Sequence, residues 1–123
     1  MGRPFLLIGS LLGLVGVMLG AFGAHALKTR LAPEMLATFE SGVRYQMYHA
    51  FALLIVAVAI GQFGAARLLV VAGWLFCAGV ALFSGSLYAL VLTGTTALGA
   101  ITPIGGVLLI GGWACLAVFA LLR

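Results

Sequence analysis

Two histidines are the side chains whose chemistry is easiest to name in this chain of 123 residues. His25 ends one long apolar stretch and His49 begins the next, so we expect both imidazoles near the same face of the molecule. Imidazoles at neighbouring helix ends can ligate a metal ion or a haem iron. No carboxylate or thiol at matching depth completes such a shell, and the simpler interpretation is that each ring bonds a helix end. We therefore expect no cofactor, with a two-histidine metal or redox site as the alternative.

Other polar residues surround these histidines in the sequence. Glu40 and Arg44 have the i,i+4 spacing of a helical ion pair, and a charged pair half out of water needs partners. One hypothesis is that Glu40 and backbone carbonyls at the end of the first apolar stretch hold Arg44, which locks this segment onto the rest of the protein. The other is that the cluster binds an anionic lipid headgroup or a partner subunit. We call this set the interfacial polar cluster: His25, Lys28, Glu40, Arg44, Gln46 and His49.

The composition of the chain defines its surroundings. It is 65% hydrophobic and only 7% charged, against roughly 25% charged residues in soluble domains. So few charges cannot cover a globule in water, which excludes a soluble enzyme, a disordered tail and a nucleic-acid-binding domain. The net charge of +4 comes from scattered residues, so we expect no nucleic acid partner. The chain is predicted to be an integral membrane protein of one domain.

Three charge-free stretches predict the membrane spans. They cover residues 4–27, 45–66 and 68–122, and a spanning helix needs about 20 apolar residues. The third stretch is long enough for two helices, and residues 93–103 are rich in helix-breaking types. We therefore predict an all-α bundle of four transmembrane helices, at about 5–26, 46–63, 67–91 and 103–122.

The connection before the second span carries its own helical pattern. Pro33 and Glu34 are typical of a helix start, and apolar residues then recur on one face up to residue 47. This pattern predicts an amphipathic helix at about 33–45. Such a helix lies in the membrane interface or extends the second span, and Gly42 marks a bend between the two parts.

The first apolar stretch has some features of a secretory signal. Arg3 precedes it, and it ends in Gly23-Ala24-His25-Ala26, which resembles a small-residue cleavage site. Its apolar run has the length of a full span, whereas the apolar part of a signal is typically about 7–15 residues. We therefore expect this helix to be retained.

Small residues recur at helical spacing in the spans. Because lipid tails are as apolar as leucine, close contact between small residues must carry much of the helix association. These stripes predict tight packing within the bundle, and a groove for lipid or a partner helix is the alternative. One stripe, the glycine seam, consists of Gly9, Gly13, Gly16, Gly20 and Gly23; the other consists of Gly73, Cys77, Ala81 and Gly85.

Several motifs resemble one membrane family along nearly the whole chain. They are GAFGAHALK from Gly20, FESGVRYQMYHA from Phe39, GSLYAL from Gly85, LGAITPIGG from Leu98 and Gly112-Trp113. Together they resemble the family known as domain of unknown function 423, which contains transmembrane protein 256-like and small bacterial inner-membrane proteins. The resemblance implies a small multi-span inner-membrane protein and adds no activity or cofactor.

The functional expectation follows from which groups the spans contain. No Asp, Glu, Lys or Arg lies well inside a predicted span, which argues against transport coupled to an ion. We expect a non-catalytic accessory or structural subunit that acts through helix contacts, with membrane lipids and other membrane subunits as partners. A passive carrier or pore for a small neutral solute is the alternative, beside the redox or metal protein.

Overall fold

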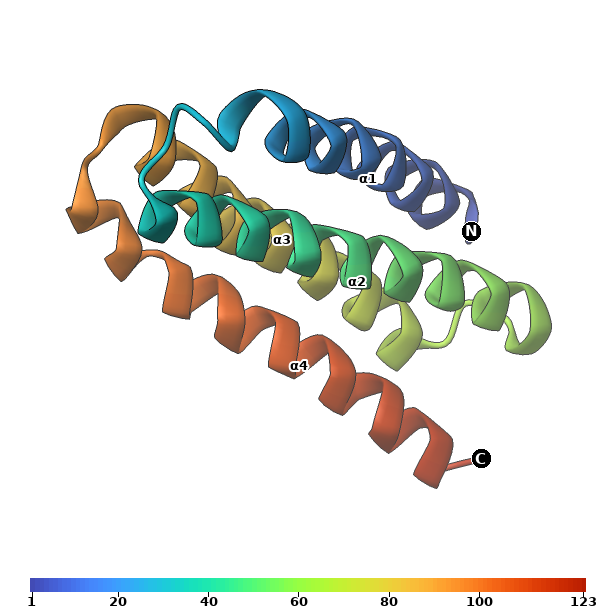
Figure 1. The fold of residues 1–123 in the computed structure, drawn as a ribbon. Helices are drawn as coiled ribbons and strands as arrows, with labels where there is room; N and C mark the ends of the chain where they lie inside the picture. Colours follow the sequence, from blue (N-terminus) through green and yellow to red (C-terminus); the bar gives the residue numbers. More distant parts are fainter.

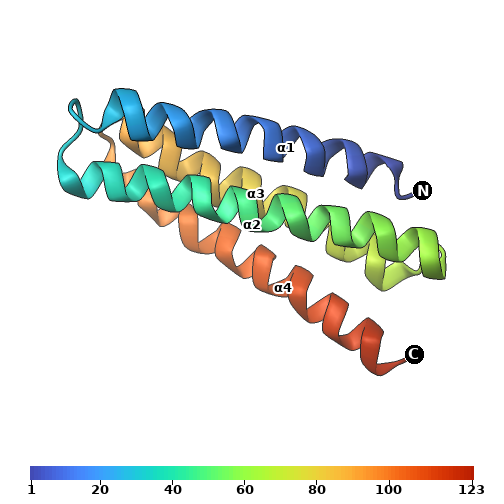
Figure 2. The same ribbon diagram turned by 45° about the vertical axis from the view of Figure 1, so that its right-hand side comes forward.

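The computed structural model describes all 123 residues and contains helices and connections only. Four long helices run alternately up and down (Figures 1 and 2), and each is long and apolar enough to cross a membrane. The predicted all-α, four-span membrane fold is therefore confirmed. The elements are α1 (Arg3–Phe22), a π-helical turn η1 (Gly23–Leu27), α2 (Pro33–Phe63), α3 (Arg67–Thr93), a 3-10 turn η2 (Thr96–Ala100) and α4 (Thr102–Leu121).

Proline and glycine set the limits of these helices. Proline occupies a first-turn position of α1, α2 and α4, where its missing N–H costs nothing. The helices α2 and α3 end at Gly64 and Gly94, whose φ angles are 87° and 70°. Side chains with a Cβ rarely adopt this backbone conformation, so glycine makes these two turns inexpensive.

Of the two alternatives for the amphipathic segment, the structure has the extension of the second span and no separate interfacial helix. Residues 33–45 are the first turns of α2, which continues unbroken for 31 residues. Gly42 lies inside this continuous helix, where it is buried and packs against the ring of Tyr88. At about 1.5 Å per residue α2 is about 46 Å long, against a hydrocarbon core of about 30 Å. The amphipathic segment is thus an extension of the second span.

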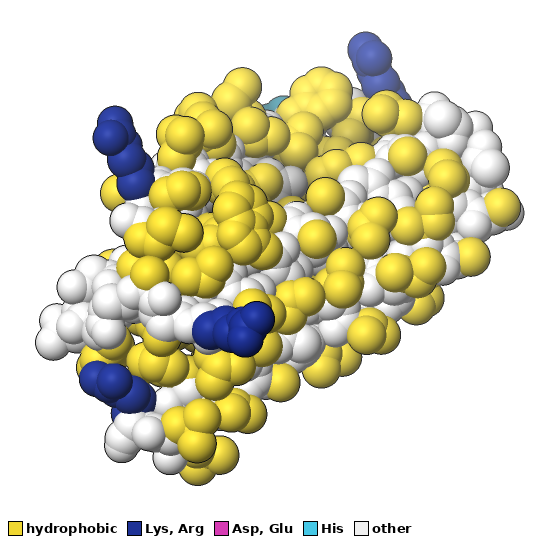
Figure 3. Space-filling view, turned by 180° about the vertical axis from the view of Figure 1, so that it is seen from behind, with side chains coloured by type: hydrophobic (Ala, Val, Ile, Leu, Met, Phe, Trp, Pro, Cys, Tyr) yellow, Lys and Arg dark blue, Asp and Glu magenta, His cyan; other side chains and the backbone are white.

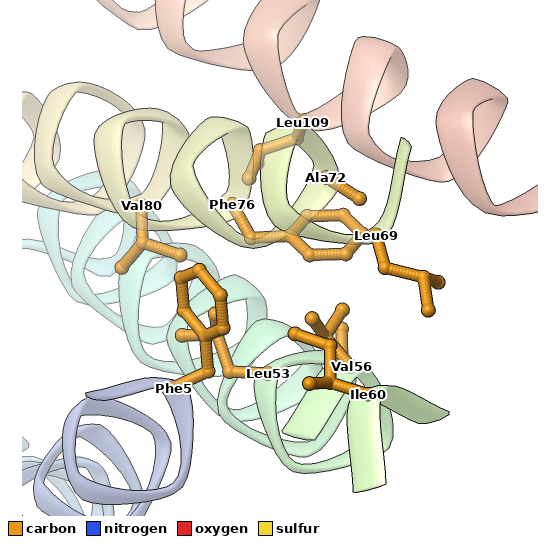
Figure 4. Packing of buried hydrophobic residues seen from close by; sticks show 10 residues of the cluster. Phe5, Leu53, Val56, Ile60, Leu69, Ala72, Phe76, Val80 and Leu109 are labelled. Atoms are coloured by element: carbon orange, nitrogen blue, oxygen red, sulfur yellow. The ribbon is translucent and has the colours of Figure 1, made fainter. Parts of the chain in front are cut away.

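The helices α2 and α3 form the centre of the bundle, and α1 and α4 lie on opposite sides of this pair (Figures 1 and 2). The core is filled by side chains from all four helices (Figure 4). The Phe5 ring of α1 points between Leu53 and Val80, and Leu109 of α4 reaches toward Phe76. The cluster consists of Phe5, Ala52, Leu53, Val56, Ile60, Leu69, Ala72, Phe76, Val80 and Leu109.

The glycine seam of α1 runs along α2 in antiparallel register. A Cβ added at Gly9 would lie 3.0 Å from the Ala50 carbonyl oxygen, and one added at Gly23 would lie 2.7 Å from the Phe39 ring. The seam contains three glycines between Gly9 and Gly23. Along the chain, their nearest neighbours are the side chains of Ala50, Met47 and Val43 in turn. The missing side chains therefore let the two backbones approach closely, as in other membrane helix pairs.

The contact between α3 and α4 uses glycines that the predicted α3 stripe did not include. A Cβ added at Gly105 would collide with the backbone of Phe83, and one at Gly79 would lie 2.5 Å from Leu109. In the predicted stripe, Gly73 meets the Phe5 ring, whereas Gly85 has open space around it. The stripe therefore differs from expectation, because α4 packs on another side of α3.

The outside of the bundle is largely apolar. Figure 3 shows hydrophobic side chains along one face, with Lys and Arg toward its two ends and no acidic side chain in view. Large apolar residues such as Val58, Val107 and Ile110 are more than 60% exposed, as expected where lipid replaces water as the solvent. The structure and the apolar composition agree on a protein integral to the membrane.

Adding one methyl group should destabilise the protein at a glycine that packs against another helix and leave its stability unchanged at a glycine with open space around it. Gly105→Ala forces α4 away from the α3 backbone, so we expect a loss of about 1–3 kcal/mol in the free energy of unfolding in detergent. Gly85→Ala is the matched control, because a Cβ there meets nothing within 4 Å. Equal stability of the two variants would contradict the packing described here.

Candidate functional site

Gln46 joins three helices in the interior of the bundle. This α2 side chain is only 3% exposed. Its amide nitrogen donates to the backbone carbonyl of Leu12 in α1 over 2.8 Å, and its oxygen accepts the Tyr88 hydroxyl of α3 over 2.7 Å. One amide therefore fixes α1, α2 and α3 relative to one another.

A second polar contact lies one turn away, between α2 and α3. The Ser84 hydroxyl donates to the carbonyl oxygen of Gly42 over 2.7 Å, and this bond is buried. Gly42 also admits the Tyr88 ring, since an added Cβ would lie 2.7 Å from a ring carbon. The glycine thus brings both α3 side chains within bonding distance of α2.

His49 connects α2 to α4, and its two hydrogen bonds assign its tautomer. Nδ1 lies 2.7 Å from the Tyr45 carbonyl oxygen, which can only accept, so Nδ1 carries the proton. Nε2 accepts the indole N–H of Trp113 over 3.0 Å. Both nitrogens of this 4%-exposed ring are therefore occupied, and the ring is neutral. Phe76 packs against the His49 and Trp113 rings and shields them.

Ser86 ties the beginning of α4 to α3. Its hydroxyl donates to the carbonyl of Phe83 over 2.9 Å, so it accepts the hydroxyl hydrogen of Thr102 over 2.6 Å. No buried side-chain nitrogen or oxygen in the protein lacks a partner. We call the hydrogen bonds of Gln46, His49, Ser84, Tyr88 and Trp113 the polar network.

The structure divides the predicted interfacial polar cluster into two groups. Gln46 and His49 are buried in the polar network. The other four members are exposed near the end of the bundle that carries the α1–α2 connection: His25, Lys28, Glu40 and Arg44. The polar contacts that fix this part of α2 come from Gln46, Ser84 and Tyr88 instead of Arg44.

The two histidines do not lie at the same level. His49 is in the middle of α2, beside Ala50, which packs near Gly13 of α1. His25 lies in η1, two residues beyond Gly23, which packs against Phe39. Twelve residues of helix, or about 18 Å along the axis, separate the two levels. The expected proximity is wrong because α2 begins at Pro33, so that His49 is no helix end.

Sequence reasoning did not identify Ser84, Tyr88, Trp113 or Thr102 as parts of this site. Serine and threonine in apolar helices commonly bond their own helix backbone, as Thr93 does to the Ala89 carbonyl, so their type alone does not indicate a partner on another helix. The available signal was Gln46 and His49, three residues apart on one face of an apolar helix. Two buried polar side chains in a membrane span require partners on other helices.

Chemically, the polar network is a closed set of paired groups. Every hydroxyl, amide and ring nitrogen in it has an acceptor or donor within the chain. It thus has the properties of a structural lock, because its bonds form only in one relative arrangement of the helices. The two cysteines, Cys77 and Cys115, are free thiols that pack against the core cluster.

Comparison with known proteins agrees with this membrane architecture. A family model described as "Protein of unknown function (DUF423)" matches residues 19–106, which include the α1–α2 connection and the whole of α2 and α3. The chain belongs to the DUF423 family. The family resemblance noted in the sequence is thereby confirmed.

Relatives of this DUF423 protein are named membrane proteins. The UPF0382 membrane protein YwdK of Bacillus subtilis is 44% identical over 118 residues, which is 96% of each chain. The UPF0382 membrane protein SAB0533 of Staphylococcus aureus is 48% identical over 111 residues, which is 90% of this chain and 89% of the relative. No solved structure matches this chain. The bacterial relatives and the four apolar helices make it an integral protein of the inner membrane.

Removing the Gln46 amide should weaken the bundle. Gln46→Leu leaves the Leu12 carbonyl and the Tyr88 hydroxyl without their partner, so we expect a loss of about 1–3 kcal/mol in unfolding free energy. In the double variant with Tyr88→Phe the loss should be smaller than the sum of the two single losses. Gln62→Leu, an exposed site on the same helix, is the control; a loss as small as that of the control would contradict the network.

Arg44, which one hypothesis from the sequence made the lock of this segment, is expected to contribute little to stability. Because Arg44 is exposed, Arg44→Ala should change the unfolding free energy in detergent by less than about 0.5 kcal/mol. A loss well above about 1 kcal/mol would restore the view that Arg44 locks the segment onto the bundle.

Proposed function

We propose that this membrane protein is a non-catalytic accessory or structural subunit that acts through helix contacts with another membrane protein. The observation that carries the proposal is a contrast between the inside and the outside of the bundle. The buried polar groups are all hydrogen-bonded within the chain, whereas the outer helix faces have no partner in it. Every buried polar side chain is paired within the chain, so the interior holds its own fold together. The outer helix faces are left for contacts beyond the chain.

The arrangement of helices supports this reading. Because α1 and α4 lie on opposite sides of the α2–α3 pair, no helix covers the outer face of α3. Ala78 and Ala81 are exposed there, and Gly85 has open space. Small residues on an exposed membrane helix permit a close approach by a second helix. We place the partner on this α3 face.

The packing of the centre argues against a passive pore as the alternative. The core cluster and the aromatic rings beside it fill the space between the helices. The two most apolar grooves open on the outer surface, one along α2 and one beside the α1–α2 connection. A solute path would therefore have to form between this chain and other molecules.

The proposal predicts a stoichiometric complex that depends on the α3 face. A tagged chain taken from native membranes in gentle detergent should carry one other membrane protein in fixed ratio, identified by mass spectrometry. Ala81→Phe should remove this partner while the melting temperature of the chain stays unchanged, because Ala81 is exposed.

Val58→Phe is the matched control, since Val58 is 71% exposed on α2. It should leave the complex intact. Recovery of the chain alone from native membranes, or an equal effect of the two variants, would contradict the proposal.

A further inference from the structure

An apolar groove lies beside the connection between α1 and α2. It has a volume of about 540 Å³, within the range of about 300–1,000 Å³ typical of small-molecule sites. Leu19 and Phe22 of α1 form one wall, and Val91 and Leu92 of α3 form another. Arg30 is the only charged residue that lines it. The groove therefore combines a hydrocarbon surface with a single cation.

The floor of the groove is held in place by the polar network. Phe39 and Tyr88 lie side by side there, with ring centroids 5.6 Å apart. The Tyr88 hydroxyl bonds Gln46, so the polar end of this side chain is engaged in the interior and its ring forms part of the groove. Because these side chains are already fixed, little conformational entropy is lost when a ligand binds against them.

The cation at the groove has no acidic competitor there. Arg30 is exposed, and the turn that carries it is fixed by hydrogen bonds from the Arg30 and Leu31 nitrogens to the Leu27 carbonyl. The chain contains only two acidic residues, Glu34 and Glu40, and neither lines the groove. Glu40 lines a separate cleft together with Lys28. The Arg30 guanidinium is thus available to an anion from outside the chain.

From these observations we propose that the groove binds one anionic phospholipid. The phosphate bonds the Arg30 guanidinium, whose planar donors suit two phosphate oxygens, and the net negative charge of the lipid, which a zwitterionic headgroup lacks, favours this contact. One acyl chain lies along Leu19, Phe22 and Leu92. Arg30 belongs to the connection outside the helices, where headgroups lie, and the apolar walls extend from there along α1 and α3.

A second groove of the protein shows why charge decides the ligand. It runs along α2 beside Phe51, Ile55 and Phe63, has a similar volume of about 530 Å³, and no charged residue lines it. Such a surface takes any acyl chain and cannot select a headgroup. Selection by charge is therefore expected only beside Arg30. This site does not depend on the proposed partner protein, because α3 residues 78–85 do not line it.

The test compares two lipids with identical acyl chains. The purified full-length chain is delipidated in mild detergent, supplied with phosphatidylglycerol or phosphatidylcholine, and examined by native mass spectrometry. We expect one retained phosphatidylglycerol and a clear preference over phosphatidylcholine. Arg30→Gln should reduce that preference about tenfold, and Arg30→Lys should give an intermediate value because it keeps the charge and loses the planar donors.

Arg67→Gln is the control for net charge, since Arg67 is exposed at the opposite end of the bundle. It should leave the lipid preference unchanged. Glycerol phosphate, which has the anion without acyl chains, should fail to displace the bound lipid. Equal retention of the two lipids, equal effects of the two glutamine variants, or displacement by glycerol phosphate would overturn the proposal. Melting curves of the variants verify that all are folded.

Discussion

Hydrocarbon provides no hydrogen bonds, and this constraint governs the structure of the bundle. A polar side chain that enters the membrane interior must find its partners inside the protein. Gln46 meets this requirement with a carbonyl of α1 and a hydroxyl of α3. Its two bonds exist only if three helices have one relative position, so the requirement for pairing becomes a specification of the fold.

Close backbone approach makes these bonds geometrically possible. Gly16 leaves space for the Met47 side chain beside Gln46, and Gly42 leaves space for the Tyr88 ring. A larger residue at Gly42 would displace that ring and lengthen its bond to Gln46. Glycine and polar residues therefore act together here, because the first brings the helices close and the second determines how they are aligned.

The same alignment shapes the surface. Tyr88 is fixed from within by Gln46, and its ring forms part of the groove beside Arg30. The outer face of α3 is free because α4 packs on the side that carries Gly79 and Phe83. Both proposed contacts of the protein, with a lipid and with another helix, thus depend on how the interior is arranged.

The sequence by itself determined the class of the protein and the number of its helices. Composition, charge-free stretches and the break near residues 93–103 required four membrane helices, because segment length and hydrophobicity are local properties. The glycine seam could be recognised for the same reason, since its spacing defines one face of one helix. Family motifs from Gly20 to Gly106 agreed with this architecture.

Only the tertiary structure decided which polar groups meet. Gln46 and Tyr88 are 42 residues apart, and His49 and Trp113 are 64 apart. No local pattern contains the rotation of one helix about its axis relative to the next, and that rotation selects each partner. It also turned Gly79 instead of Gly85 toward α4. The continuous α2 placed His49 in mid-helix, away from His25, because the helix already begins at Pro33.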